Sequence, residues 1–247
     1  MEENFLKQKK AIYKRWWFIV LVVFLALFVP LAAYFGYNFY QIYRGLQAGG
    51  FDQVQAEQMI KEQAQFDMAK LVDENSPMLG NKAAKITIVE FGDFNCPRCL
   101  EAFPVVRQLP DKYKDQIRIF WRNYPVVKDD SVDFAKAGVC AHRQGKFWDL
   151  HDLFFQTQGT GFGRNVETLA KQAGLDMAVF DKCYKNTLTE AEIRKDYFAA
   201  EEGKVAGTPT FFINGFKIEG PITLEMWQKI IDVFAKIYGN GETGIGN

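Results

Sequence analysis

The chain has 247 residues, of which 48% are apolar, and its 30 basic and 30 acidic side chains leave a formal net charge of zero. An apolar content this high supports a packed core and excludes a chain that is disordered throughout. The charge balance excludes the strongly basic surface of a nucleic-acid-binding protein. Four cysteines are too few to staple a whole fold, but they suffice for one catalytic pair and one structural pair.

A long apolar segment lies near the N-terminus. Residues 16–43 contain no charged side chain, and tryptophans and tyrosines occur at the two ends, where a bilayer has its interfaces. Pro30 lies inside the segment, which membrane helices tolerate. Lysines and arginines are concentrated in residues 1–15. The positive-inside rule therefore predicts a cytoplasmic N-terminus (1–15) and a single transmembrane helix (16–43) in the cytoplasmic membrane, with the remaining chain in the periplasm or an equivalent extracytoplasmic space.

Two other interpretations of this segment stay open. A cleaved signal peptide normally has an apolar region of about 7–15 residues followed by an A-x-A-like site. The apolar run here is longer, and residues 31–33 (Leu-Ala-Ala) match such a site poorly. A buried core helix is disfavoured because a run that is apolar on all faces is rare in a small soluble domain. As an anchor or as a signal peptide, the segment exports the rest of the chain to a compartment that permits disulfides.

Residues 44–75 are expected to form a linker with a stalk helix. Gly49 and Gly50 interrupt the chain, and residues 51–75 are rich in glutamine, alanine, glutamate and lysine. Their apolar residues are irregularly spaced, which favours a solvated stalk and leaves an oligomerising stalk as the alternative. At the other end of the chain, residues 239–247 are expected to form a flexible tail.

The period of the apolar pattern changes after residue 85. Residues 86–91 (Ile-Thr-Ile-Val-Glu-Phe) form a short apolar run with β-branched residues, which predicts a buried strand. Residues 117–124 predict a second strand, which Pro125 helps to end. Residues 210–218 predict a hairpin around an Asn-Gly pair, because Asn-Gly accepts the positive φ angles of a type I′ turn.

Helical periodicity dominates between the second strand and the hairpin. We expect an insertion of several helices at about residues 129–204, and a closing helix over residues 224–237. The glycine-rich residues 158–165 do not follow a strand, so they are interpreted as a plain connection and not as a nucleotide-binding turn. The order of strand, helix, strand, helical block, hairpin and helix predicts an α/β fold.

Residues 96–99 read Cys-Pro-Arg-Cys and open a helical pattern. The partial positive charge of a helix N-terminus favours the thiolate of Cys96, and Arg98 adds a positive charge nearby. Cys99 lies one turn later and is the natural resolving thiol, so the pair can pass a disulfide to a substrate through a mixed disulfide. Half of a zinc site and an inert disulfide remain alternatives, although the other cysteines and histidines lack zinc-ligand spacing, so no metal site is predicted.

Three motifs together resemble a known family. They are residues 76–80 (Ser-Pro-Met-Leu-Gly), residues 86–99 with the strand and the two cysteines, and residues 207–215 (Gly-Thr-Pro-Thr-Phe-Phe-Ile-Asn-Gly). In this order they resemble the DsbA-like branch of the thioredoxin superfamily. The resemblance covers residues 76–238 and implies a thioredoxin-like domain that carries a helical insertion.

The resemblance also implies roles for the residues around the cysteines. Cys96 is similar to the family's exposed nucleophile and Cys99 to its buried partner. Glu90 falls where thioredoxin-like proteins carry a buried acid that helps proton transfer at the inner cysteine; the alternative is a surface charge at the edge of the strand. Pro104 matches the family's helix-kinking proline.

A second group of residues is expected to bind substrate. Pro209 resembles the family's cis-proline, which leaves the preceding backbone open to pair with a substrate strand. Thr208 is expected to touch both the cysteines and the substrate, with Pro97 beside them. The alternative for residues 208–209 is an ordinary trans proline at the start of a strand.

The remaining cysteines, Cys140 and Cys183, lie in the predicted insertion. Many relatives look similar in having a second pair there, which implies a structural disulfide; two buried free thiols are the alternative. His142 and His151 receive no role beyond that of satisfied surface or core histidines.

The expected function is oxidation of cysteine pairs in exported proteins. It needs no cofactor besides the redox-active Cys96–Cys99 disulfide, and it needs a membrane redox partner that restores this disulfide. A reductase or isomerase of the same fold is the first alternative, since threonine before the cis-proline resembles those enzymes. A non-catalytic anchored binding or holdase module is the second alternative.

Overall fold

The computed structural model describes residues 66–160 and 164–239, together with eight helical residues between positions 20 and 37. The chain divides into two compact units, Met1–Gln55 and Ala56–Asn247. The sheet and the helices described below belong to the second unit.

Several predicted segments of the chain lie wholly or mostly outside the described residues. They are the N-terminus (1–15), most of the anchor (16–43), most of the stalk and residues 240–247 of the tail. Within the described residues, no helix has both the length and the apolar character needed to cross a membrane.

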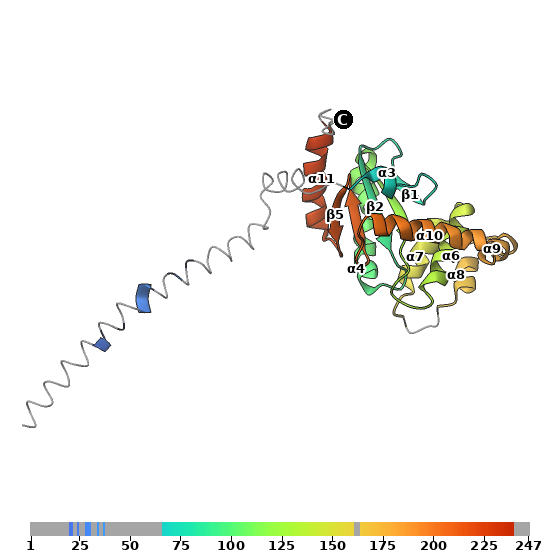
Figure 1. The fold of residues 1–247 in the computed structure, drawn as a ribbon, viewed down its shortest axis with the longest axis horizontal. Coiled ribbons are helices and arrows are strands. Elements are labelled where there is room, and N and C mark those ends of the chain that lie inside the picture. Colours follow the sequence, from blue (N-terminus) through green and yellow to red (C-terminus); the bar gives the residue numbers. More distant parts are fainter. Residues whose placement is uncertain are drawn as a thin grey trace, which may run out of the picture. The chain divides into compact units, whose positions relative to one another are not determined.

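Five strands form one sheet in the order β1-β3-β2-β4-β5 (Figure 1). The central strand β2 (Ile86–Gly92) pairs in parallel with β3 (Ile117–Asn123) and antiparallel with β4 (Thr210–Ile213). Every residue of β2 is buried, as expected for a strand that is covered on both faces. With the helices around it, this sheet forms the thioredoxin-like α/β fold.

The predicted hairpin is present as β4 and β5 (Phe216–Glu219). Asn214 and Gly215 join the strands with φ angles of 46° and 92°, the positive values that a type I′ turn requires. The Asn214 side chain also accepts a hydrogen bond from the Thr87 amide at 2.7 Å, which ties the turn to β2.

One face of the sheet packs on three helices: α4 (Pro97–Val106), α5 (Leu109–Tyr113) and α11 (Leu224–Gly239). A short 3₁₀ helix, η1 (Lys114–Gln116), leads from α5 into β3. Ile88 of β2 lies on this face and Val89 on the other, because successive strand residues point to opposite faces. Glu90 therefore points toward the face that carries α4.

The predicted insertion consists of five helices within the described residues: α6 (Ser131–Arg143), α7 (Phe147–Gln156), α8 (Val166–Gln172), α9 (Met177–Tyr184) and α10 (Thr187–Glu202). Their apolar core is continuous with Phe94 and Trp121 of the sheet domain and with both Cys96 and Cys99. The insertion thus forms one wall of the site that contains these cysteines.

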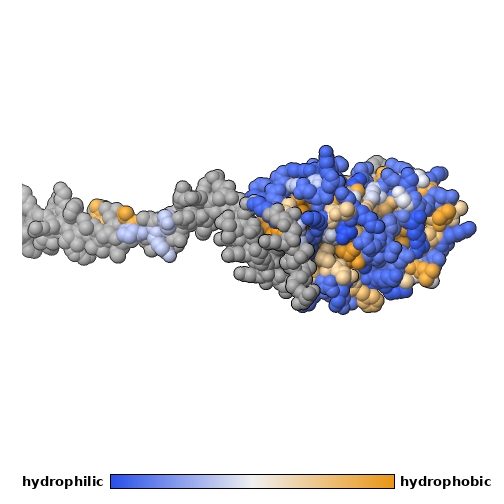
Figure 2. Space-filling model, turned by 90° about the horizontal axis from the view of Figure 1, so that it is seen from above, coloured by the Kyte–Doolittle hydropathy of each residue, from blue (hydrophilic) through white to orange (hydrophobic). Residues whose placement is uncertain are grey.

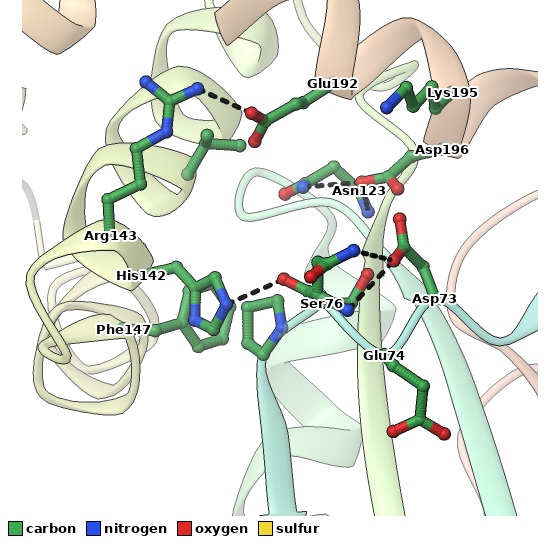
Figure 3. Close-up of a pocket in the computed structure, with 13 residues that line it drawn as sticks. Asp73, Glu74, Ser76, Asn123, His142, Arg143, Phe147, Glu192, Lys195 and Asp196 are labelled. Carbon is green, nitrogen blue, oxygen red and sulfur yellow. Dashed lines mark hydrogen bonds and ion pairs between the residues drawn. The ribbon is translucent and has the colours of Figure 1, made fainter.

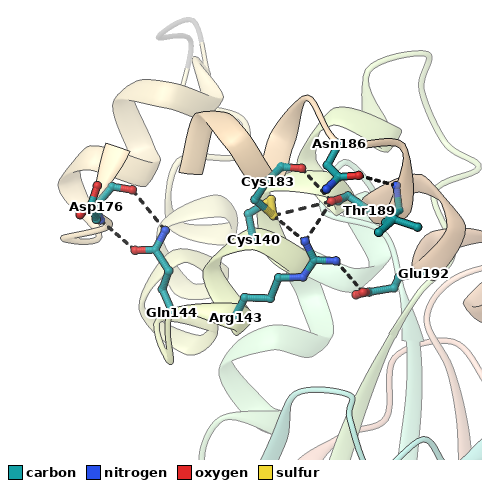
Figure 4. The surroundings of a disulfide bond; sticks show 9 residues. Cys140, Arg143, Gln144, Asp176, Cys183, Asn186, Thr189 and Glu192 are labelled. Carbon is teal, nitrogen blue, oxygen red and sulfur yellow. Dashed lines mark hydrogen bonds and ion pairs between the residues drawn. A yellow bond between two sulfur atoms is a disulfide. The ribbon is translucent and has the colours of Figure 1, made fainter. Parts of the chain in front are cut away.

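A disulfide joins Cys140 of α6 to Cys183 of α9, with an S–S distance of 2.01 Å (Figure 4). This is the pair that the family resemblance implied. Arg143 donates to Cys183 Sγ at 3.2 Å and to a carboxylate oxygen of Glu192 at 2.6 Å. Because Glu192 lies on α10, the disulfide and Arg143 together hold three helices of the insertion.

The folded domain begins before the predicted boundary at residue 76. Residues 66–75 contain the short helix α3 (Met68–Leu71), and Leu71 is buried against Phe120 and Phe212 of the sheet. Phe66 donates its amide hydrogen to the Gly215 carbonyl at 2.9 Å. Burial of Leu71 therefore makes this part of the predicted stalk an element of the folded domain.

The edge strand β1 (Met78–Gly80) is not apparent from the sequence pattern, because three residues are too few to show alternation. It pairs antiparallel with β3 and covers that edge of the sheet. Figure 2 shows one face of the folded unit, a mainly hydrophilic surface with scattered apolar spots. Scattered apolar side chains of this kind are normal on the surface of a folded domain.

Candidate active site

Strand β2 leads through a short turn to Cys96, which is the N-cap of α4. Asp93 organises this turn. One of its carboxylate oxygens accepts from the Asn95 amide at 2.8 Å, and the other accepts from the amides of Val126 and Val127 at 2.9 and 2.8 Å. The cysteines are therefore presented at the carboxyl end of the central strand, on a turn that is fastened to the loop after β3.

Cys96 and Cys99 are both free thiols, and both are buried. The pKa of Cys96 is lowered to about 5, chiefly by a hydrogen bond with the Cys99 side chain, and burial opposes this shift. The Thr208 side chain and the backbone N–H groups of Cys99 and Arg98 lower the pKa of Cys96 further. Burial raises the pKa of Cys99 well above its usual value, and the neighbouring Cys96 raises it further. At neutral pH the first cysteine is thus a thiolate and the second a thiol, the division expected for a nucleophile and its resolving partner.

The peptide bond between Thr208 and Pro209 is cis, which excludes the alternative of an ordinary trans proline. Cys96 Sγ lies 3.2 Å from the Thr208 carbonyl oxygen, so the loop that leads into β4 contacts the nucleophile directly. Gly220 donates its amide hydrogen to the Pro209 carbonyl at 2.8 Å and supports the far side of this loop. The fold therefore brings Thr208 and Pro209, which are distant in sequence, against Cys96.

Glu90 is 4% exposed, which excludes the alternative of a surface charge at the strand edge. Burial raises the pKa of Glu90 to about 8, so the side chain is mostly protonated at neutral pH. Its charged form also raises the pKa of Cys99, which places the carboxyl group within electrostatic reach of the inner thiol. This position suits the exchange of a proton with Cys99, and that role stays a prediction.

Arg98 and Pro97 are exposed on the first turn of α4. The Arg98 guanidinium lies against Gly220, in the space that a side chain at residue 220 would occupy. It is the backbone N–H group of Arg98 that lowers the pKa of Cys96. The contribution of Arg98 to the thiolate therefore comes through its main chain, whereas its side-chain charge is directed toward the loop that supports Pro209.

Two residues of the site leave little signal in the sequence pattern. Gly220 has a φ of 89°, which favours glycine, and it contacts both Pro209 and Arg98. Asp93 is 2% exposed, and its carboxylate accepts from backbone amides. A glycine directly after a short strand is a weak hint of a special backbone angle, and nothing in the sequence shows which loop Asp93 would hold.

The two histidines lie outside the cysteine site. His142 Nε2 is 2.8 Å from the Asn75 carbonyl oxygen and lines a polar cavity of about 540 Å³ (Figure 3). His151 is buried, and its Nδ1 is 2.9 Å from a carboxylate oxygen of Asp152. Each histidine thus has a polar partner. Among the described residues, no group of three or more His, Cys, Asp or Glu side chains is arranged to hold a metal ion.

Known proteins resemble this chain over the domain that carries the site. The Thioredoxin family model matches residues 72–233, more than half of the chain. The probable disulfide bond formation protein D of Bacillus anthracis is 31% identical over 149 residues, which cover 56% of this chain and 69% of that protein. A crystal structure of a thioredoxin-like oxidoreductase from Silicibacter pomeroyi has a TM-score of 0.63 and 28% identity, and the match covers 69% of this chain and 98% of that chain.

Longer relatives match as well. The Na(+)/H(+) antiporter NhaA 3 of Salinispora tropica is 35% identical over 148 residues, which cover 59% of this chain and 22% of that protein. The chain thus spans less than a quarter of this relative, and antiport is a property of that protein. The matches to the thioredoxin model and to disulfide bond formation protein D, together with the paired cysteines beside a cis-proline, show that the chain belongs to the thioredoxin family, in the branch of DsbA-like thiol–disulfide oxidoreductases.

Proposed function

We propose that this protein oxidises cysteine pairs of exported proteins, from a domain that residues 16–43 anchor outside the cytoplasm. The observation that carries the proposed direction is the lowered pKa of Cys96 beside the raised pKa of Cys99. A stabilised thiolate favours the reduced form of the enzyme, and an enzyme whose reduced form is stabilised is a strong oxidant.

The proposed reaction starts from the Cys96–Cys99 disulfide. A substrate thiolate attacks Cys96 Sγ, a mixed disulfide forms, and Cys99 leaves with the electron pair and takes up a proton, for which Glu90 is the nearby donor. A second substrate thiolate then attacks the substrate sulfur and displaces the Cys96 thiolate. The substrate loses two electrons and the enzyme gains two, so a membrane redox partner must accept them to restore the disulfide.

Substrate binding is assigned to the loop around the cis-proline. The Thr208 carbonyl faces Cys96, and the backbone before a cis-proline is open to pair with an extended segment. Pro97 lies exposed beside the nucleophile and contributes an apolar contact. Main-chain pairing would admit many sequences, which suits an enzyme that acts on a range of unfolded or partly folded chains.

The test of direction is the redox equilibrium of the full-length protein with glutathione, following the Cys96–Cys99 couple. A potential near about −120 mV supports the oxidase, because the reduced form is then strongly stabilised. A potential near about −270 mV contradicts it and supports a reductase that receives electrons across the membrane. The reductase or isomerase is the second candidate, since Thr208 precedes the cis-proline.

The extracytoplasmic location has a separate test. Intact cells that express the protein are treated with a membrane-impermeant maleimide under mild reduction. Labelling of Cys96 supports the proposed location, whereas labelling only after lysis contradicts it. The Cys96→Ser variant distinguishes the enzyme from a binding module, because a module keeps partner binding without thiol exchange.

A further inference from the structure

Asn95, the residue directly before Cys96, forms side-chain hydrogen bonds with residues of the helical insertion and of the loops beside it. Asn95 Nδ2 donates to an Asp130 carboxylate oxygen at 2.8 Å and to Ser131 Oγ at 3.2 Å. Asn95 Oδ1 accepts from Arg164 Nη1 at 2.6 Å. Asn95 is 2% exposed, so these hydrogen bonds are shielded from water and fix its side chain in one orientation.

Arg164 has further contacts at the same place. Its Nη2 donates to the Phe94 carbonyl at 3.0 Å and to the Phe154 carbonyl at 2.8 Å, and its guanidinium lies 4.2 Å from the centre of the Phe134 ring. One guanidinium group therefore joins the turn before Cys96 to α6 and α7. Arg164 lies in the glycine-rich stretch for which the sequence predicts no more than a plain connection.

We infer that Arg164 is a positioning residue, which holds the turn of residues 93–96 so that the Cys96 sulfur meets its hydrogen-bond donors. The geometry of that turn matters because Cys96 donates its amide hydrogen to the Asp93 carbonyl at 3.0 Å and caps α4. The planar fork of arginine can bind the Phe94 carbonyl and the Asn95 side chain at once, which a lysine ammonium at the end of a flexible chain cannot reproduce.

Loss of Arg164 should loosen the turn without removing it. Asp93 still holds the Asn95 amide, and α6 and its preceding loop still hold the Asn95 side chain. What changes is the alignment of the Cys96 sulfur with the backbone N–H groups that stabilise its thiolate. The inference concerns the reactivity of Cys96 and holds for oxidase and reductase alike, so its failure would not decide the proposed direction.

The test compares Arg164→Met with the wild type in the full-length protein whose Cys96–Cys99 pair is reduced. The rate of Cys96 alkylation by iodoacetamide is measured from pH 3 to pH 9, with circular dichroism to verify folding. We expect the pKa of Cys96 to rise by roughly one unit, the size of effect that loss of one favourable hydrogen bond produces. A folded Arg164→Met protein with an unchanged pKa of Cys96 would overturn the inference.

A second variant separates position from charge. Arg164→Lys keeps the charge that faces Asp93 and Asp130 but loses the fork, so it should also raise the pKa of Cys96. The ionisable groups beside the reacting thiols, Cys99 on α4 and Glu90 on β2, are the same in both variants. A wild-type pKa of Cys96 in Arg164→Lys overturns the inference, and it does so even if Arg164→Met fails to fold.

Arg107→Met is the matched control for a general loss of stability. Arg107 makes a comparable two-atom pair with Asp152, at 2.9 Å from Nε and 3.0 Å from Nη2, but it lies away from the turn before Cys96. Its loss should lower stability and leave the pKa of Cys96 unchanged. An increase of the pKa of Cys96 in Arg107→Met equal to that in Arg164→Met would overturn the inference.

Discussion

At the scale of single residues, the site depends on where each ionisable group lies in the fold. Cys96 and Cys99 lie in the same apolar core, but their pKa values move in opposite directions, because a hydrogen bond with the Cys99 side chain stabilises the Cys96 thiolate while burial disfavours the thiolate of Cys99. The same argument applies to Glu90, whose neighbours on β2 are apolar and buried. Burial keeps this carboxyl group protonated at a pH where an exposed glutamate is charged.

Glu90 gives a prediction about stability and pH. Its pKa is raised from 4.5 to about 8 in the folded protein, so the unfolded chain releases this proton first as the pH rises. The folded state therefore loses stability relative to the unfolded state from about pH 4.5 up to about pH 8. Glu90→Gln removes this loss and should be more stable than the wild type at pH 7 by about 3 kcal/mol.

Urea unfolding at pH 5 and pH 8, with the Cys96–Cys99 pair reduced in both proteins, measures the difference. The gain in the free energy of unfolding of Glu90→Gln should be small at pH 5 and large at pH 8. An equal difference at both pH values would show that Glu90 does not titrate in this range.

Gly220 carries a second prediction at this scale. Gly220→Ala places a methyl group against the Arg98 guanidinium at a φ of 89°, so it should destabilise the protein by about 1–3 kcal/mol. Gly174→Ala is the matched control, since Gly174 has a φ of 78° and nothing lies near the position of an added Cβ. Thermal unfolding should show the larger loss of stability for Gly220→Ala. Equal losses of stability in both variants would mean that the contact with Arg98 does not contribute to the effect.

At the scale of secondary-structure elements, buried polar bonds decide how the insertion meets the sheet. Helix α10 is fastened to β3 by Asp196, which accepts from Arg122 Nε at 2.6 Å and from the Asn123 side chain at 2.8 Å. Arg122 is nearly fully buried, and its Nη1 donates to the Leu71 carbonyl at 2.8 Å. The same arginine therefore joins α3, β3 and α10.

Removal of Asp196 should have a large effect. Asp196→Ala leaves Arg122 buried without its carboxylate, which should cost about 3–5 kcal/mol. Glu202→Ala is the control, because it breaks the exposed pair of Glu202 with Lys70 and should change stability little. Chemical denaturation of both variants checks the prediction; a mild effect of Asp196→Ala would mean that water reaches Arg122.

The Cys140–Cys183 disulfide acts at the same scale. It links residues 43 positions apart, and its loss in the double variant Cys140→Ala/Cys183→Ala should lower stability by about 2–4 kcal/mol. Unfolding is compared without reductant, so that the wild type keeps the bond. Alkylation of Cys96 should stay unchanged in the variant, and a changed Cys96 reactivity would show that this disulfide also shapes the active site.

At the scale of the whole molecule, helix α4 lies between two apolar cores. Ala102 and Val106 pack with the sheet and α11, whereas Cys99 belongs to the core of the insertion. Cys96 belongs to the core of the insertion as well, and its sulfur lies against the cis-proline loop. Both cysteines take part in the exchange: Cys96 forms the mixed disulfide, and Cys99 is the leaving thiol, which attacks Cys96 when the exchange runs in reverse.

The variant Cys99→Ser should therefore retain its substrates. The Cys96 thiolate can still attack a disulfide of a substrate protein and displace one of its thiols, but the resulting mixed disulfide lacks the Cys99 thiol that would attack Cys96 and release the substrate. Non-reducing electrophoresis of the full-length variant should show adducts that disappear with reductant. Cys96→Ser is the control and should form none; adducts of equal amount in both variants would point to another thiol.

The strands β2 and β3, the hairpin and the active-site cysteines could be predicted because their signals are local. The buried run of β2, the Asn-Gly turn and the two cysteines one helical turn apart each need only a few neighbouring residues. The start of the folded domain before residue 76 could not be predicted in this way, since a single buried residue, Leu71, leaves no periodic pattern.

By itself the sequence determined the α/β order, the cysteine pair at the start of a helix and the residues around the proline, because motifs and periodicity are properties of neighbours along the chain. Only the tertiary structure decided that Gly220 supports Pro209, that Arg98 turns toward it, and that Arg164 reaches the residue before the nucleophile. These contacts join segments that are distant in sequence. Their energies depend on burial and on hydrogen-bond geometry, which exist only once the chain has folded.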